Sequence, residues 1–194
     1  MKIIELLGRV NIPLFFDYQI ERMFPDESKH QVNVQLARFV RAGVLMRLKR
    51  GLYVFSHGKI DEMVLANFIY RPSYVSLESA LNYYGIIPDV VGNVTSVSPV
   101  TTRNFRTGRG VFIYSKIAGD LYFGRQTVKD SDSEFYFSIA EAEKALLDYV
   151  YIRKIRDLSD QRVDLSGIDR KKLIKYGKIF PARVMRTINE QYRQ

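Results

Sequence analysis

The chain has 194 residues, of which 46% are hydrophobic and 13% aromatic, and its 30 basic and 21 acidic side chains give a net charge of +9. This apolar content is enough for a packed core, which excludes a globally disordered chain, and the length suits one large domain or two small ones. The absence of cysteine excludes disulfides and cysteine-ligated zinc. The sequence has neither an apolar run long enough to predict a membrane span nor the pattern of a signal peptide, so we expect a cytoplasmic protein.

The first part of the chain predicts two short helices. Residues 2–8 show the apolar spacing of a helix, and Pro13 suits the first turn of a second helix that runs to about Met23. Pro25 cannot continue that helix, so a turn is expected there.

Residues 28–55 predict a basic amphipathic helix followed by a small basic hairpin. Ser28 is a suitable N-cap, and Gly43 can adopt the left-handed conformation that ends a helix. Residues 44–55 then have the pattern of two strands around a turn at residues 49–51. Three helices and a hairpin in this order are typical of the winged helix-turn-helix, so we expect residues 1–58 to form a winged-helix DNA-binding domain.

The distribution of charge favours a nucleic-acid partner for this segment. Residues 28–60 contain seven Lys or Arg side chains and no carboxylate, and scattered solvating charge would not leave so long an acid-free stretch. Two further stretches are basic: residues 90–129 hold six basic side chains and one acidic one, and residues 149–194 hold twelve and five. The sequence assigns no partner to these two.

A helical wheel for residues 29–42 gathers the apolar side chains on one face and leaves the opposite face for DNA. A helix in the major groove reads bases with its N-terminal half and touches phosphates with its flanks. We expect Arg38 to read guanine or to hold a phosphate, and the hairpin to reach the DNA backbone or the adjacent minor groove. The predicted DNA contacts are Lys29, His30, Gln31, Asn33, Val34, Arg38 and Arg41 from the helix, and Arg47, Lys49 and Arg50 from the hairpin.

Residues 59–194 predict a mixed α/β domain, which makes the whole chain α+β. Ser76 is expected to cap one of its helices and Gly85 to end it, while Glu143 and Lys144 either form an internal pair or face a partner surface. Helices are expected at residues 61–70, 77–84, 139–154 and 181–192 and after an N-cap at Asp169, and strands at residues 74–75, 94–100, 110–117, 121–124 and 134–137.

Three blocks follow one another along the chain: RLKRGLYVF at residues 47–55, PSYVSLESALNYYGIIP at 72–88 and AEAEKALLDYVY at 140–151. Together they resemble the AbiEi-like antitoxins of abortive-infection, type IV toxin–antitoxin systems, which act in phage defence. The resemblance implies a winged helix that represses its own operon by binding double-stranded promoter DNA at inverted repeats. It also implies a C-terminal antitoxin domain that counters a nucleotidyltransferase-like toxin, generally without a stable complex. Ala142 stands where the family often has proline.

A metal-dependent nuclease is the competing enzyme class. Pro88-Asp89 before a β-rich region is similar to the start of a PD-(D/E)xK motif, which needs a second carboxylate and a lysine on the next strand to hold Mg²⁺. Residues 90–119 contain neither Asp nor Glu. The two histidines, His30 and His57, cannot supply a metal cluster, and both lie in or beside the predicted winged helix, which argues against a Ser-His-Asp triad. We therefore expect no catalytic residues, no metal and no cofactor. The alternative function is a winged helix that docks a protein or binds RNA without binding a promoter.

Overall fold

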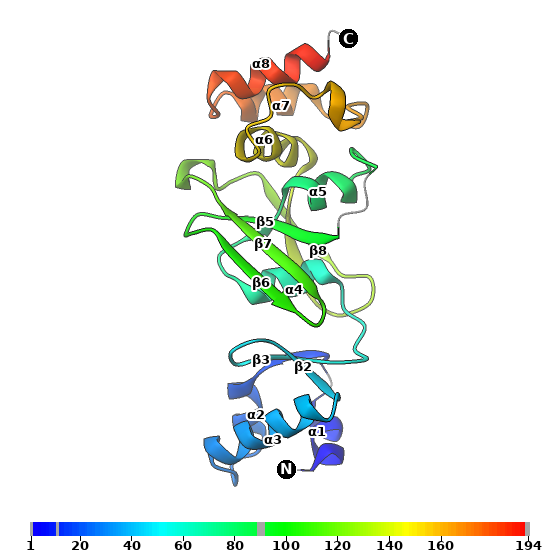
Figure 1. Cartoon of the computed structure of the whole chain (residues 1–194), viewed down its shortest axis with the longest axis vertical. Coiled ribbons are helices and arrows are strands. Elements are labelled where there is room, and N and C mark those ends of the chain that lie inside the picture. Colours follow the sequence, from blue (N-terminus) through cyan, green and yellow to red (C-terminus); the bar gives the residue numbers. More distant parts are fainter. Residues whose placement is uncertain (1, 11, 89–91, 193–194) are drawn as a thin grey trace.

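A computed structural model describes residues 2–10, 12–88 and 92–192 of the chain. Figure 1 shows an elongated molecule with the N-terminal helices and a small sheet at one end, a larger sheet in the middle and the C-terminal helices at the other end. The protein is α+β, as predicted. No helix in the described parts of the chain is long and apolar enough to cross a membrane.

The N-terminal unit contains three helices and an antiparallel sheet with the strand order β1-β3-β2. The predicted helix start at Pro13 is wrong, because the backbone of Leu14 and Phe15 pairs with β3 and their side chains are buried. Its elements are α1 (Ile3–Arg9), β1 (Leu14–Phe16), α2 (Asp17–Met23), α3 (Lys29–Arg41), β2 (Leu45–Lys49) and β3 (Leu52–Phe55).

The predicted ends of α3 are confirmed. Ser28 Oγ accepts the Gln31 N–H at 3.3 Å, and Gln31 Oε1 accepts the Ser28 N–H at 2.7 Å, which forms a reciprocal capping box. Gly43 follows the helix with a φ of 72°, in the left-handed region that favours glycine. Gly51, with a φ of 77°, makes the hairpin turn, and its carbonyl accepts the Asp17 N–H at 2.9 Å, which joins the turn to the start of α2.

The second unit is built on a six-stranded mixed sheet with the order β6-β7-β5-β4-β9-β8. The β5–β7 and β4–β9 pairs are parallel, and the remaining neighbours are antiparallel. The strands are β4 (Tyr74–Val75), β5 (Asn93–Ser98), β6 (Arg103–Thr107), β7 (Gly110–Lys116), β8 (Arg125–Lys129) and β9 (Tyr136–Ala140); the helices are α4 (Glu62–Ile69), α5 (Leu77–Tyr83), α6 (Ala142–Ile152), α7 (Arg170–Gly177) and α8 (Ala182–Gln191), with short 3-10 turns η1 (Gly119–Leu121) and η2 (Ser159–Gln161).

Two local expectations for this unit are corrected, and one strand is missing from the expectations. The apolar residues 121–124 do not form a strand, because Leu121 ends η1 and is buried in the core, and β8 begins only at Arg125. The edge strand β6 was not predicted, since its mostly polar sequence lacks the alternation of a half-buried strand. Ser76 stands at the N-cap of α5, but its hydroxyl donates to Asp148 at 2.9 Å instead of capping the helix.

The small sheet lies between two hydrophobic cores. Phe15, Leu45 and Tyr53 pack with the buried residues of α1, α2 and α3. Leu48 and Leu52 belong to the core of the second unit, together with Leu14 and Val54. The proposed division at residue 58 therefore falls beside an apolar contact between the two units.

Candidate nucleic-acid interface

Helix α3 presents one polar face to solvent and buries the other. Val32 and Leu36 are fully buried against the N-terminal core, as the wheel predicts. The exposed members of the predicted set on this helix are Lys29, His30, Gln31, Arg38 and Arg41, while Asn33 and Val34 are half-buried at the edge. The helix is thus anchored by its apolar side and leaves its cationic side accessible.

Several of these polar groups already have partners within the chain. The Asn33 side-chain amide donates to the Lys29 carbonyl at 3.0 Å, and Lys29 Nζ lies 3.6 Å from Glu21 Oε1. Arg41 Nε donates to the Ala37 carbonyl at 3.5 Å, which leaves its terminal nitrogens for other contacts. His30 and Arg38 make no side-chain hydrogen bond or ion pair with another residue that the structure describes. These two are the most available for a ligand.

The hairpin divides the three predicted basic contacts between two sides. Arg47 is exposed and lies opposite Tyr53, while its Nε donates to the Lys49 carbonyl at 3.4 Å. Tyr53 packs toward the helices, so Arg47 is on the side of the sheet that faces α3. Arg50 is exposed in the turn. Arg47 and Arg50 are therefore compatible with a surface that includes α3.

Lys49 points the other way. Its ammonium group donates to the Ile69 carbonyl at 2.7 Å and lies 6.0 Å from the centre of the Phe16 ring. Burial, followed by repulsion from Arg71, lowers the pKa of Lys49. Because the Lys49 ammonium group is held between the hairpin and α4, only the other nine predicted residues are proposed as DNA contacts.

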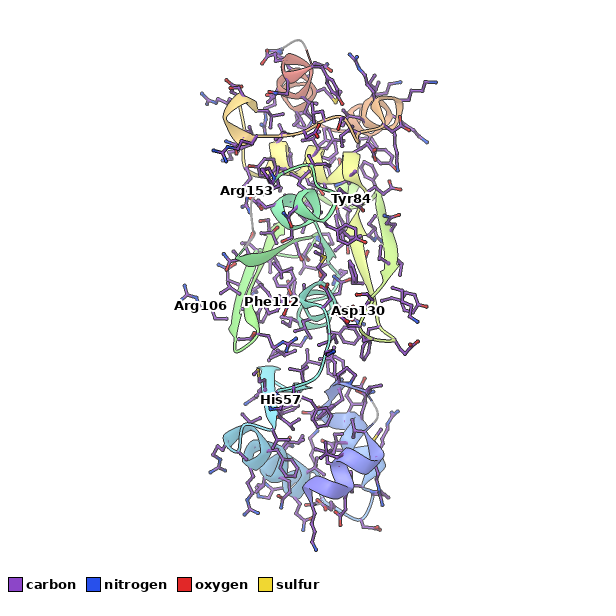
Figure 2. All side chains as sticks on the ribbon, turned by 90° about the vertical axis from the view of Figure 1, so that its right-hand side faces the viewer. His57, Tyr84, Arg106, Phe112, Asp130 and Arg153 are labelled. Atoms are coloured by element: carbon purple, nitrogen blue, oxygen red, sulfur yellow. The ribbon has the colours of Figure 1, made fainter. Side chains whose placement is uncertain are left out.

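Strand β6 brings further basic side chains to the same side of the molecule. Arg103, Asn104 and Arg106 are exposed on this sheet edge, and neither arginine pairs with another residue in the described ranges. Figure 2 shows Arg106 projecting away from the body of the molecule, on the side where α3 lies. The sequence alone does not place these basic residues beside the N-terminal unit. The lack of acidic residues between positions 90 and 119 is the feature that points to a basic surface there.

The turn after β6 packs against the N-terminal unit. A Cβ placed on Gly108 would lie 3.1 Å from Met46 Sδ of β2. Arg109 Nη2 donates to the Ile60 carbonyl at 3.0 Å and lies 3.7 Å from Glu62 Oε1. The β6–β7 hairpin is thereby held beside β2, which makes the basic residues of β6 neighbours of the hairpin rather than a remote patch.

The block at residues 140–151 contains a buried charge network. Lys144 pairs with Asp148, both with fully buried side chains, and donates to the Tyr74 hydroxyl at 2.7 Å. Burial lowers the pKa of Lys144 and raises that of Asp148. Glu143 instead lies 3.4 Å from Lys172 Nζ, so Glu143 and Lys144 do not form a pair with each other. These charges hold α6 to its neighbours and are closed to a ligand.

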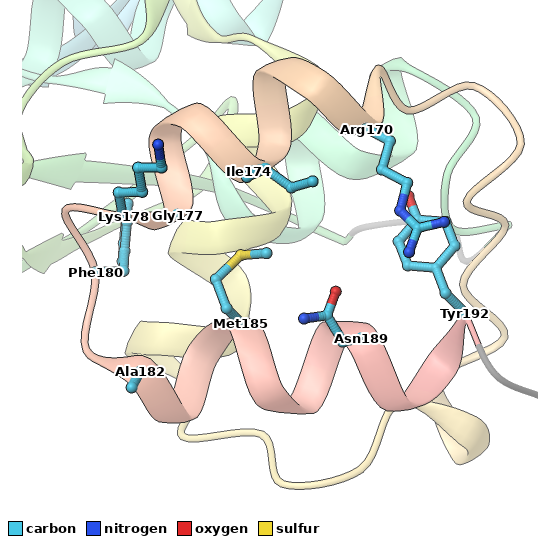
Figure 3. Close-up of a pocket in the computed structure, with 9 residues that line it drawn as sticks. All are labelled: Arg170, Ile174, Gly177, Lys178, Phe180, Ala182, Met185, Asn189 and Tyr192. Atoms are coloured by element: carbon cyan, nitrogen blue, oxygen red, sulfur yellow. The ribbon is translucent and has the colours of Figure 1, made fainter.

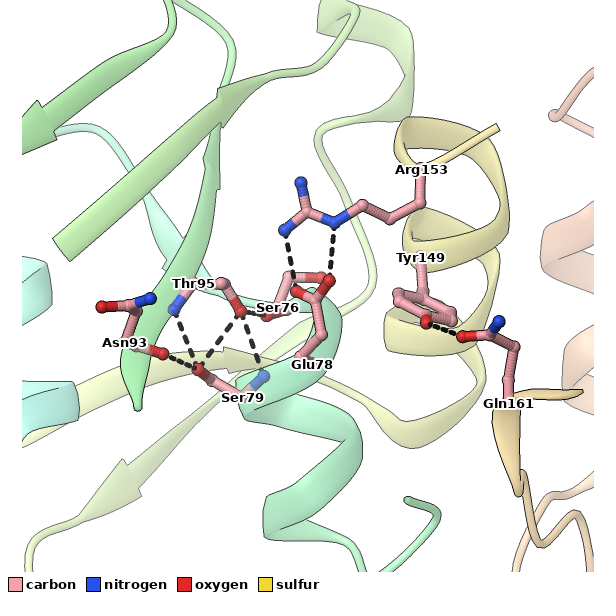
Figure 4. Close-up of polar contacts among 8 residues, drawn as sticks. All are labelled: Ser76, Glu78, Ser79, Asn93, Thr95, Tyr149, Arg153 and Gln161. Carbon is pink, nitrogen blue, oxygen red and sulfur yellow. Dashed lines mark hydrogen bonds and ion pairs between the residues drawn. The ribbon is translucent and has the colours of Figure 1, made fainter. Parts of the chain in front are cut away.

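A second polar network joins α5 to β5 and to the end of α6 (Figure 4). Thr95 Oγ1 accepts the Ser79 N–H at 3.0 Å and donates to the Ser76 carbonyl at 2.8 Å. Glu78 accepts two hydrogen bonds from Arg153, at 2.6 and 2.9 Å. The hydroxyls and the carboxylate are thus occupied in fixing the fold.

A groove of about 610 Å³ separates α7 from α8 (Figure 3). Ile174 and Met185 line its apolar part, and the Arg170 guanidinium lies 4.9 Å from the centre of the Tyr192 ring. No carboxylate or histidine is among its lining residues. Its polar lining consists of Arg170, Lys178, Asn189 and Tyr192.

Among the described residues, no group of three or more His, Asp or Glu side chains could hold a metal ion. Asp89, from the nuclease-like dipeptide, lies outside them. Comparison with known proteins found no family model that matches the chain and no curated protein with a significant match.

Proposed function

We propose that this protein is a DNA-binding antitoxin of the AbiEi-like class that represses its own operon. The observation that supports DNA binding best is α3, whose exposed face is basic and free of carboxylates while its other face is buried. The order of elements in the N-terminal unit, α1-β1-α2-α3-β2-β3, supports a winged helix-turn-helix in which α3 is the recognition helix.

In this proposal α3 enters the major groove. His30, Gln31 and Val34 face base edges, and Arg38 reads guanine or holds a phosphate. Lys29, Arg41, Arg47 and Arg50 neutralise backbone phosphates on either side, with Asn33 at the edge of the helix. The basic residues of β6, Arg103 and Arg106, extend the same surface along the duplex.

Fluorescence anisotropy with the DNA upstream of the gene tests the repressor function. Arg38→Ala should weaken binding by about tenfold, as expected for the loss of a base or phosphate contact worth about 1–3 kcal/mol. Lys175→Ala, which removes an exposed charge from α7 at the far end of the molecule, is the matched control and should change affinity less than twofold. Absence of specific upstream binding at low salt would exclude the repressor function.

The antitoxin part of the proposal rests on the resemblance of the three sequence blocks. We expect a nucleotidyltransferase-like gene beside this one, whose product is harmful when expressed alone and harmless with this protein. An Arg38→Ala/Arg41→Ala variant should lose repression and keep the rescue, because the C-terminal unit is intact. Loss of rescue in a folded variant of this kind would contradict the assignment of the two activities to different units.

The groove between α7 and α8 favours one alternative, a winged-helix protein that docks another protein. Its lining includes Ile174, which is 45% exposed, and cationic residues at both ends. This alternative predicts no promoter binding, so the anisotropy experiment separates it from the main proposal.

A further inference from the structure

A second basic site lies at the end of the molecule opposite α3. The segment that follows α6 and one face of α8 border a hollow of about 450 Å³. Four cationic side chains line it, Lys154, Arg156, Arg183 and Arg186, and the only carboxylate among its lining residues is Glu190. Figure 1 places α8 and α3 at opposite ends of the long axis, so this hollow is not part of the proposed DNA surface.

The local backbone sets Lys154 in an unusual position. It follows α6 with a φ of 55°, in the left-handed region, and the Ile155 N–H donates to the Val150 carbonyl at 3.2 Å. These features form a Schellman motif, in which glycine is the usual residue at the position that Lys154 occupies. A lysine there is less favourable for folding than glycine, and residues held in this way are concentrated at functional sites.

The arginines come from successive turns of one helix face. Arg183 and Arg186 are three residues apart on α8, so their side chains are neighbours. Arg183 Nη2 donates to the Tyr151 carbonyl at 3.2 Å, and its guanidinium lies 5.6 Å from the centre of the Tyr151 ring. This contact positions the guanidinium and leaves its other N–H donors available. Arg183 is also in the first turn of α8, where the helix dipole favours an anion.

Four cationic side chains and one carboxylate line the hollow, so its net charge is positive. Lys154, Arg156 and Arg186 make no side-chain hydrogen bond or ion pair with any other residue that the structure describes. Like charges around one cavity repel one another, and a dense anion relieves this repulsion. Guanidinium groups hold phosphate oxygens through paired hydrogen bonds, and the volume falls in the range of small-molecule sites.

We propose that this hollow binds the triphosphate group of a nucleoside triphosphate. A triphosphate places several negative charges within a short distance, which suits four cations around one cavity. The phosphates of a duplex lie along a convex surface, so a hollow of this size fits a compact anion better. This proposal does not depend on the proposed function.

Binding of ATP and GTP to the full-length protein, measured by calorimetry at physiological ionic strength, tests the proposal. Lys154→Gly should weaken binding at least tenfold while raising the melting temperature, because glycine relieves the left-handed backbone. Arg186→Ala should also weaken binding severalfold. Arg162→Gly is the matched control: Arg162 also has a left-handed φ, of 48°, is exposed and does not line the hollow, so this substitution should leave affinity unchanged.

Two further probes identify the group that is recognised. AMP should bind at least tenfold more weakly than ATP, and equal affinities would overturn the proposal. A single-stranded RNA that binds more tightly than ATP and loses affinity in Lys154→Gly would overturn it in favour of a nucleic-acid backbone. Absence of ATP and GTP binding at millimolar concentration, or equal affinities of Lys154→Gly and the unchanged protein, would also exclude it. Promoter binding is measured separately, so failure of either proposal leaves the other standing.

Discussion

Lys144 and Asp148 are charged side chains that have lost all contact with solvent. Their separation of four residues on α6 places them on the same helix face, and the Tyr74 and Ser76 hydroxyls donate to Asp148 at 3.0 and 2.9 Å. Each charge is tolerated because the other compensates it. Removal of one partner should therefore cost far more than removal of both.

Asp148→Ala should lower the free energy of unfolding by about 3–5 kcal/mol, because it leaves Lys144 buried without a counter-charge. The double variant Lys144→Met/Asp148→Leu should recover most of this loss. Urea denaturation measures both values, and Asp120→Ala, at an exposed carboxylate, should change stability by less than about 0.5 kcal/mol. Equal losses in the single and double variants would contradict the compensation.

Glu78 should make the protein sensitive to acid. Burial acts to raise the pKa of Glu78, but the hydrogen bonds and charge of Arg153 outweigh it and lower the pKa below the usual 4.5. A lowered pKa contributes stability above the unfolded value, and this stability is lost as the pH falls through the folded value. As the pH is lowered below 4.5, the urea concentration at the midpoint of unfolding should decrease. This decrease should be smaller in Arg153→Ala. If the urea midpoint of Arg153→Ala changes with pH as much as that of the unchanged protein, the Glu78–Arg153 pair does not cause the acid sensitivity.

Among the predictions for helices and strands, those for the ends of helices were the most accurate. Ser28, Gly43 and Asp169 marked helix ends correctly, because caps are local interactions between neighbouring residues. β1 could not be found in this way, because it becomes a strand only by pairing with β3, which is distant in the sequence. β6 could not be found because its mostly polar sequence lies at the edge of the sheet and lacks the alternation of a half-buried strand. The basic face of α3 followed from periodicity, but the direction of Lys49 depends on α4, which no local pattern reveals.

The hairpin turn offers a test of backbone geometry with an internal control. Gly51→Ala should destabilise the protein by about 1–2 kcal/mol, because Gly51 has a positive φ and a Cβ there would lie 3.0 Å from Asp17 Oδ2. Gly8→Ala should stabilise α1 by about 0.5–1 kcal/mol, since no atom lies within 4 Å of its added Cβ. Thermal melting compares the two variants directly. Changes in melting temperature of the same sign would contradict the different backbone requirements of Gly51 and Gly8.

At the scale of the whole molecule, basic surfaces occur at separate places along one axis. The α3 face and β6 lie on one side, whereas the hollow beside α8 is at the far end. Because these surfaces are distant from one another, their contributions to binding can be measured independently.

The salt dependence of DNA binding tests whether β6 reaches the duplex in the proposed complex. The logarithm of the binding constant should fall with the logarithm of salt concentration by roughly 0.9 per phosphate neutralised. Arg103→Ala/Arg106→Ala should reduce this slope by up to about 2, with little change in sequence preference. An Arg183→Ala/Arg186→Ala variant is the control with the same charge change. An unchanged slope in the β6 variant would confine the interface to the N-terminal unit.

The small sheet between the two cores limits which N-terminal units can be joined to the second unit. Leu52, Tyr53 and Val54 are consecutive buried residues, so this strand has no solvent-facing side. A replacement N-terminal unit whose hairpin had one polar face would place that face against the apolar surface of the second unit. Exchange of units by recombination is therefore obstructed. Under the proposed function, a new DNA specificity would be reached more readily by substitutions on the exposed face of α3.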